Sequence, residues 1–195
     1  MIFPPPRRRF DVRSRFLGLA SGASAILAAV VLSFFVAPGL DGAFGAGLAV
    51  LASVIVVVDW RSYTIPDAAN AAAAALGLAS RAIGAGDPAA AIAVAIARAV
   101  AMGALFLAFQ YAYRRLRDRE GMGLGDVKLA AVAGLWLDAG DLPIAVDIAC
   151  LSALLFVVLS RLRAGPAPLA TTKLPFGAFF APSIWLCWLF AAWRG

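Results

Sequence analysis

Two aspartates occupy the ends of apolar segments, where an ionisable side chain is uncommon. Asp59 follows a run of three valines, and Asp126 follows the glycine-rich stretch Gly-Met-Gly-Leu-Gly. A pair of carboxylates can hydrolyse a peptide bond: the ionised one takes a proton from a water molecule, and the protonated one polarises the scissile carbonyl. At close range the two groups share one proton and titrate together. Asp59 and Asp126 are therefore a candidate catalytic pair, provided that the fold brings them together.

Several other chemistries have no suitable residues in this chain. Histidine is absent, which excludes Ser-His catalysis and removes the commonest metal ligand. Cys150 and Cys187 lie within apolar stretches without a Cys-x-x-Cys spacing, so we interpret both as small core residues. The sequence therefore predicts no metal and no cofactor.

The composition is typical of a protein dissolved in lipid. The chain is 63% hydrophobic and 14% charged, with a mean hydropathy of +0.90, whereas soluble domains carry about 25% charged residues. The net charge of +6 does not indicate nucleic acid, because most basic residues lie in short segments between apolar runs, as membrane topology requires. The broad class is a polytopic membrane protein.

Seven apolar segments approach the length that crosses a bilayer as a helix. They cover residues 17–36, 43–58, 68–83, 89–111, 125–137, 142–159 and 175–192. The third is rich in alanine and contains Asn70 and Arg81, and the fifth is short, so both are expected to lie among neighbouring helices. The sequence predicts an all-α polytopic bundle of six to seven transmembrane helices, preceded by a basic arm over residues 1–16.

The distribution of basic residues predicts the orientation of the bundle. With a cytoplasmic N-terminus, 14 of the 17 Lys and Arg residues fall in cytoplasmic segments, which the positive-inside rule favours. Asp59 and Asp126 then reach the same cytoplasmic side, Asp126 at a helix N-terminus whose dipole favours a negative charge. A basic segment before an apolar run also begins secretory signals, but about 20 apolar residues suit a retained helix. We expect the arm to attract anionic lipid, with a solvated tail as the alternative.

Three short motifs follow one another along this scaffold. They comprise Asp59 followed by Ile65, Pro66 and Asp67; then Gly123, Gly125, Asp126 and Lys128; and finally Pro175, Phe176 and Gly177. From residue 51 to residue 181 the chain resembles the prepilin peptidase (type IV leader peptidase) family of GxGD-type aspartic membrane proteases. The resemblance implies one transmembrane peptidase domain over residues 17–195, in the bacterial inner membrane, with Asp59 and Asp126 as catalytic residues. It also implies that the substrates are prepilins or pseudopilins, which lose a short basic leader at the cytoplasmic face.

The chain departs from the family pattern in two places. Members that also methylate the mature pilin carry a cysteine-rich insertion after the first helix, whereas the connection from Val36 to Ala43 is short and contains no cysteine. The chain thus resembles the peptidase-only branch, often associated with Flp-type pili, and no N-methyltransferase activity is expected. Ala178 stands where the family motif has proline, and this is expected to loosen the start of the last helix.

Two polar residues of the motifs have more than one possible role. Asp67 follows Pro66, a favourable first helical residue, so it is expected to stabilise the start of the third helix; direct substrate contact is the alternative. Lys128 lies two residues after Asp126 and so points to another side of its helix. It is expected to bind lipid phosphate or to extend toward the membrane surface, with tuning of the aspartate pair as the alternative.

Further polar and aromatic residues have structural explanations. Arg98 and Asp147 lie inside the fourth and sixth spans, at depths that differ by less than the reach of an arginine. Because charges inside a membrane are usually paired, we expect an ion pair between them. Four tryptophans in the outer halves of spans are expected to anchor at the interface or to pack in the core. These are Trp136, Trp185, Trp188 and Trp193.

Three other functions fit parts of the sequence. A transporter would use the aspartates to relay protons or bind a cation, but it needs a polar path to the outer side, where only Arg98 and Asp147 offer one. A presenilin-like protease shares GxGD, but its first aspartate usually follows a tyrosine, whereas Asp59 follows Val58. A catalytically inactive assembly factor is disfavoured by the presence of both aspartates.

Overall fold

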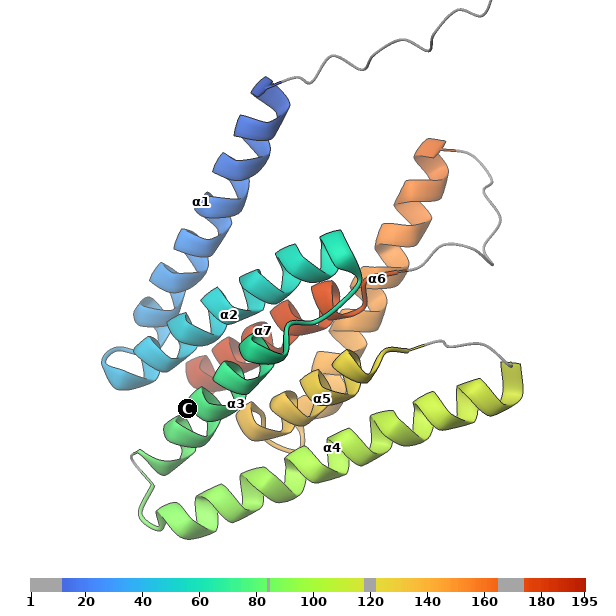
Figure 1. The fold of residues 1–195 in the computed structure, drawn as a ribbon. Coiled ribbons are helices and arrows are strands. Elements are labelled where there is room, and N and C mark those ends of the chain that lie inside the picture. Colours follow the sequence, from blue (N-terminus) through green and yellow to red (C-terminus); the bar gives the residue numbers. More distant parts are fainter. Residues whose placement is uncertain (1–11, 84, 118–121, 165–173) are drawn as a thin grey trace, which may run out of the picture.

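The computed structural model describes residues 12–83, 85–117, 122–164 and 174–195, which form seven α-helices and no strand (Figure 1). The helices are α1 (Val12–Val36), α2 (Leu40–Ser62), α3 (Asp67–Ala82), α4 (Pro88–Arg117), α5 (Leu124–Trp136), α6 (Asp141–Ala164) and α7 (Gly177–Arg194). Each coincides with one predicted apolar segment, so the all-α polytopic bundle is confirmed. The first helix begins at Val12, five residues earlier than expected. The remainder of the basic arm lies outside the described residues.

Three of these helices have the length and composition of membrane spans. They are α2, α4 and the stretch Asp141–Arg163 of α6, with 23, 30 and 23 residues. By contrast, α5 has 13 residues and extends about 20 Å, less than the ~30 Å of a bilayer's hydrocarbon core. Most of its residues are buried, from Leu129 to Trp136, which confirms its expected place among neighbouring helices. In α3 only one side is buried, so the expectation holds there in part.

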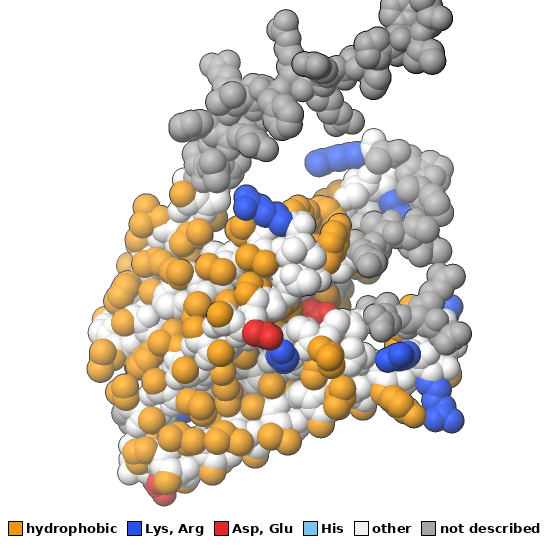
Figure 2. All heavy atoms as spheres, in the orientation of Figure 1, with side chains coloured by type: hydrophobic (Ala, Val, Ile, Leu, Met, Phe, Trp, Pro, Cys, Tyr) orange, Lys and Arg blue, Asp and Glu red, His pale blue; other side chains and the backbone are white. Residues whose placement is uncertain are grey.

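Successive helices alternate in direction, so one end of the bundle collects the ends of α2, α4 and α6 and the starts of α3, α5 and α7 (Figure 1). The short helix α5 is central and packs against α3, α4 and α7. Hydrophobic side chains cover most of the face in Figure 2, and Lys and Arg side chains lie mainly along its upper and right margins, near those collected ends. The helix ends that carry Asp59 and Asp126 therefore lie on the basic side of the bundle.

Phenylalanines connect α4 and α6 to the start of α7. The ring of Phe106 on α4 is stacked on that of Phe180, with centroids 5.6 Å apart, and Phe176 lies 5.4 Å from Phe180. On the other side of α7, Phe156 of α6 lies 5.7 Å from Phe179. Such ring pairs add to the apolar burial, so the first turn of α7 is held between two neighbouring helices.

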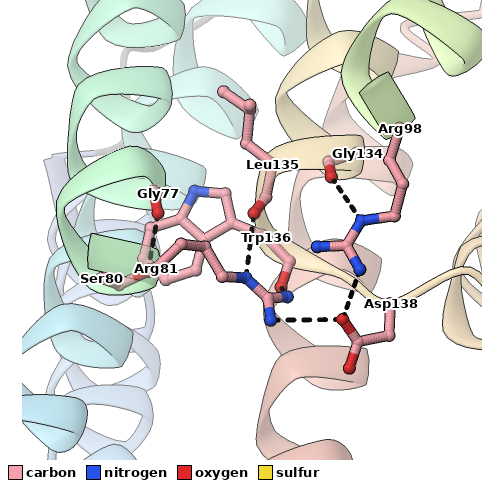
Figure 3. A network of polar contacts seen from close by, with 8 residues as sticks. All are labelled: Gly77, Ser80, Arg81, Arg98, Gly134, Leu135, Trp136 and Asp138. Carbon is pink, nitrogen blue, oxygen red and sulfur yellow. Dashed lines mark hydrogen bonds and ion pairs between the residues drawn. The ribbon is translucent and has the colours of Figure 1, made fainter. Parts of the chain in front are cut away.

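The predicted ion pair between Arg98 and Asp147 is wrong. Figure 3 shows that Arg98 bonds instead to Asp138, in the turn after α5, with 2.6 Å between its Nη1 and the Asp138 Oδ1. Arg81 of α3 reaches the same oxygen at 3.2 Å. Matching depth did not bring the two side chains into contact: α4 packs on α5 and α6 packs on α7, and a cavity lies between Arg98 and Asp147.

The same two arginines satisfy the last carbonyl groups of α5 (Figure 3). Arg98 Nε donates to the Gly134 carbonyl, and Arg81 donates to those of Leu135 and Trp136. The last carbonyls of a helix have no partner within it and carry a partial negative charge, which a cation stabilises. Cations from α3 and α4 therefore fix the far end of the helix that begins near Asp126.

Three of the four tryptophans are packing residues. Trp136 is buried and donates from Nε1 to the Ala73 carbonyl at 2.9 Å, and Trp185 donates to Ser33 Oγ at 3.1 Å. Trp188 packs on Gly45, where a Cβ would lie 1.9 Å from the indole ring. Trp193 is exposed. The expectation that these residues pack in the core is thus confirmed for Trp136, Trp185 and Trp188.

The two cysteines occupy different environments. Both are free thiols, and Cys187 is buried in the core as expected, whereas Cys150 is exposed. The prediction for Cys150 is wrong because α6 packs on α7, which leaves much of the apolar surface of α6 uncovered.

Candidate active site

Asp59 lies three residues before the end of α2 and caps the start of α7. Its side chain is buried, with the residue 4% exposed, and its Oδ2 accepts a hydrogen bond from the Ala178 N–H at 2.9 Å. The N–H of Gly177 also interacts with this carboxylate. The first N–H groups of a helix have no partner within it and carry a partial positive charge. A carboxylate from α2 supplies that partner, so α2 and α7 are joined at Asp59.

Asp126 is held at the start of α5 by its own turn. It is the third residue of that helix, and its Oδ2 accepts the N–H of Gly123 at 3.1 Å, while its own N–H donates to the Gly123 carbonyl at 3.2 Å. The predicted position at a helix N-terminus is confirmed. The Asp59 and Asp126 carboxylates lie close enough for their charges to interact. The fold therefore brings together the two acids that are 67 positions apart in the chain.

Ile65 is the residue at which the three sequence motifs meet. A Cβ on Gly125 would lie 3.1 Å from the Ile65 Cβ, and a Cβ on Gly177 would lie 2.6 Å from the Ile65 Cδ1 and 3.0 Å from the Asp59 Oδ2. The starts of α5 and α7 can approach Ile65 this closely only because both contact positions are glycine. Ile65 thus sets the separation of the two helix ends that hold the acids.

Asp67 and Lys128 form an ion pair beside this site. Lys128 Nζ lies 2.6 Å from Asp67 Oδ1, with both side chains more than half exposed. Asp67 is the first residue of α3, after Pro66 at the N-cap. Its carboxylate pairs with a residue of α5. The pair joins the starts of α3 and α5. Asp67 is a partner that the sequence did not predict for Lys128. An exposed pair of this kind contributes at most about 1 kcal/mol.

The Pro175–Gly177 motif directs the start of α7 at Asp59. Pro175 is buried, Phe176 lies 6.4 Å from the Phe106 ring, and the Phe176 carbonyl accepts the N–H groups of Phe179 and Phe180. The helix start is regular, and the expectation that Ala178 loosens it stays a prediction. Alanine provides here the N–H that binds Asp59, which a proline lacks.

Two further features of the site were not predicted from the sequence. Gln110 of α4 donates from Nε2 to the Met122 carbonyl at 2.8 Å and so fixes the segment that leads into α5. Its only signal in the sequence is an amide within an apolar segment. Next to it, α4 and the start of α5 enclose a cavity of about 760 Å³, which includes Tyr111, Arg114 and Gly123 in its wall. Gly123, whose N–H binds the Asp126 carboxylate, thus lies in the wall of this cavity.

The described residues do not assemble a metal site. No group of three or more acidic or cysteine side chains within those ranges is placed to hold an ion. The donor set at the site consists of the two aspartates and backbone N–H groups, which suits acid–base chemistry on a water molecule.

Gly177→Ala is expected to lower kcat by about 10- to 100-fold, the effect of displacing a catalytic group by about an ångström. The new methyl group would press on Ile65 and on the Asp59 carboxylate. Cleavage rates of the purified variant measure the effect, with its thermal unfolding as a control for folding. Combining it with Ile65→Val removes the Cδ1 contact. The double variant should regain part of the activity, and full activity in the single variant would contradict the tight contact at Asp59.

Comparison with known proteins agrees with this arrangement. A family model described as the type IV leader peptidase family matches residues 43–158, which is more than half of the chain and includes Asp59, Ile65 and Asp126. A search of curated proteins and of solved structures found no match. The matched region and the geometry of its two acids lead to one conclusion: the chain belongs to the type IV leader peptidase family.

Proposed function

We propose that the chain is an aspartic endopeptidase that removes the short basic leader from prepilins or pseudopilins, at the cytoplasmic face of the bacterial inner membrane. Membership of the family implies a protease of type IV leader peptides. The observation that carries the aspartic mechanism is the pairing of Asp59, bound to the start of α7, with Asp126, bound at the start of α5.

The pair supplies both a base and an acid. The ionised carboxylate takes a proton from a water molecule, whose oxygen attacks the carbonyl carbon of the scissile bond, while the protonated carboxyl donates to the carbonyl oxygen. Collapse of the tetrahedral intermediate re-forms the carbonyl, returns the donated proton to the carboxylate that gave it, and breaks the C–N bond, while the leaving amine takes the proton that the base removed from water. The pair then holds one proton again. The backbone N–H of Gly123 holds the Asp126 carboxylate, and that of Ala178 holds the Asp59 carboxylate. These fixed donors keep both groups in place during the reaction.

The charge distribution supports a cytoplasmic site. Arginines follow or end α2, α4 and α6 on the side of the bundle where Asp59 and Asp126 lie, and the positive-inside rule assigns such an end to the cytoplasm. A basic leader in extended form would meet the two acids there. The connection between α1 and α2 covers residues 37–39 and contains no cysteine, which supports a peptidase without N-methyltransferase activity.

The structure disfavours a proton transporter. Every residue of α5 between Lys128 and Trp136 is apolar or glycine, and most are buried, so no polar side chain of α5 continues the path from Asp126. At the opposite end Asp138 and Asp141 are engaged by arginines. A relay requires titratable groups in succession, and these elements do not supply them.

Co-expression with candidate prepilins tests the proposal. The expected result is leader removal, with N-terminal sequencing of the pilin placing the cut after the glycine that ends the leader. The purified chain in liposomes, assayed for proton flux, provides the counter-test. Proton flux with no cleavage of any candidate prepilin would replace the peptidase assignment by the transporter.

A further inference from the structure

Asn70 is a buried amide without a protein partner. The residue is 4% exposed, and neither its Oδ1 nor its Nδ2 forms a hydrogen bond with any described group. Leaving a buried polar group unsatisfied costs about 1–3 kcal/mol, and most such groups in folded proteins bond to protein or to ordered water. An apolar residue would avoid this cost at the same position. The amide therefore indicates a bound partner in the working protein.

The position of Asn70 is tied to the aspartate pair. Its backbone N–H donates to the Pro66 carbonyl at 3.1 Å, and Pro66 follows Ile65, which packs against the starts of α5 and α7. Asn70 is three residues after the start of α3, and Asp59 is three residues before the end of α2. At 1.5 Å per residue, each lies about 4.5 Å along its helix from the short connection that holds Ile65. Asn70 thus lies at about the same depth as Asp59, on the helix that packs beside α2.

The amide lies on the face of α3 that packs on α5. Seven residues further along α3, Gly77 packs on Trp136, where a Cβ would lie 2.8 Å from the indole Nε1. Arg81, eleven residues further, bonds to the Leu135 carbonyl. Spacings of seven and eleven residues return to the same side of a helix. On α5 the residues between Lys128 and Trp136 are apolar or glycine, so no side chain of that stretch can pair with the amide.

Water is the partner that fits this position. The described residues hold no cluster of metal ligands, and buried polar groups without a protein partner usually bond to ordered water. A buried water needs two to four polar partners, of which the amide offers a donor and an acceptor. We propose that Asn70 holds an ordered water in the interface of α3 and α5, at the depth of Asp59, and thereby positions the water that the aspartate pair activates. Asn70 is a positioning residue, and this inference rests on the proposed peptidase function.

The test uses two variants of the same shape, Asn70→Thr and Asn70→Val, in the full-length chain. Threonine keeps a hydrogen-bonding oxygen where valine has a methyl group. The valine variant is expected to lose about tenfold in kcat relative to the threonine variant, because the water is displaced, with KM unchanged within about twofold. Its thermal unfolding temperature is expected to equal or exceed that of the threonine variant, since the buried polar group and the water bound to it are replaced together by an apolar group.

The kcat and the unfolding temperature of the two variants together test the role of Asn70. Loss of kcat in the valine variant without loss of stability supports the inference. Equal kcat in both variants overturns it, as does a valine variant that unfolds at a lower temperature, because a purely structural role then explains Asn70. A wild-type chain that cleaves no leader overturns the proposed function and this inference together. If the wild type cleaves the leader and the two variants have equal kcat, the inference alone is overturned and the proposed function stands.

Discussion

Asp59→Asn and Asp126→Asn each yield a folded protein whose leader cleavage falls at least about 1,000-fold, as expected when a general acid or base is removed. An asparagine cannot take a proton from water at neutral pH, and it cannot share one with the remaining aspartate. Each variant thus loses the protonation change on which the mechanism depends. N-terminal sequencing of co-expressed prepilin, with quantified precursor and product, measures the loss.

Folding should survive both substitutions. The Asp59 Oδ2 accepts from Ala178, and the Asp126 Oδ2 accepts from Gly123. An amide oxygen can accept the same bonds. Both variants should therefore reach wild-type yield and unfold at a temperature close to that of the wild type.

Asp147→Asn is the matched control. Asp147 is also an aspartate of a membrane-spanning helix, exposed on its surface, and the described residues include no ion pair to it. Its substitution is expected to leave cleavage within about twofold, since changes away from buried partners have small effects. Substantial cleavage by either Asp59→Asn or Asp126→Asn would refute the aspartate mechanism.

Gly134→Ala is expected to destabilise the protein by about 3 kcal/mol or more, at or beyond the upper end of the usual cost of overpacking. The added Cβ would lie 2.5 Å from the Ala99 backbone nitrogen and 2.6 Å from its Cα. Backbone atoms of a packed helix cannot turn aside as a side chain can, so α4 and α5 must separate. That movement also strains the bond from Arg98 Nε to the Gly134 carbonyl. Thermal unfolding in detergent and the yield of monodisperse protein measure the effect.

Gly103→Ala provides the control within the same pair of helices. A Cβ at Gly103 would meet only the Ala131 Cβ, at 3.5 Å, which is an ordinary contact. Alanine is also the better helix former, by about 0.5–1 kcal/mol. This variant is expected to be as stable as the wild type or more stable. Equal stability of Gly134→Ala and Gly103→Ala would show that α4 and α5 are not packed this closely.

Local sequence predicted the helices well. A run of apolar residues long enough to cross lipid must satisfy its backbone groups internally, so it forms a helix wherever its neighbours are. Seven segments and their order could therefore be predicted from hydropathy. Breaks at Pro66 and at the glycines before Asp126 marked helix starts, because their backbone restrictions are local. The burial of the short α5 followed from its length.

Lateral packing could not be predicted in the same way. Hydropathy predicts how deep in the membrane a residue lies. It does not predict which helix packs beside that residue or which face of its own helix the residue occupies. The Arg98–Asp147 prediction failed for this reason, as did the assignment of Cys150 to the core. The bond from Asp67 to Lys128 joins α3 to α5, and no local pattern indicates which helices are neighbours.

The sequence by itself determined that Asp59 and Asp126 lie at helix ends on the same side of a membrane bundle, because chain direction alternates from one span to the next. Only the tertiary structure decided how they are held. The N–H groups of α7 bind Asp59, and Ile65 separates the two helix starts at the contact glycines Gly125 and Gly177. These contacts join residues up to 119 positions apart. They depend on close packing of three helices, a property of the assembled bundle that no single segment encodes.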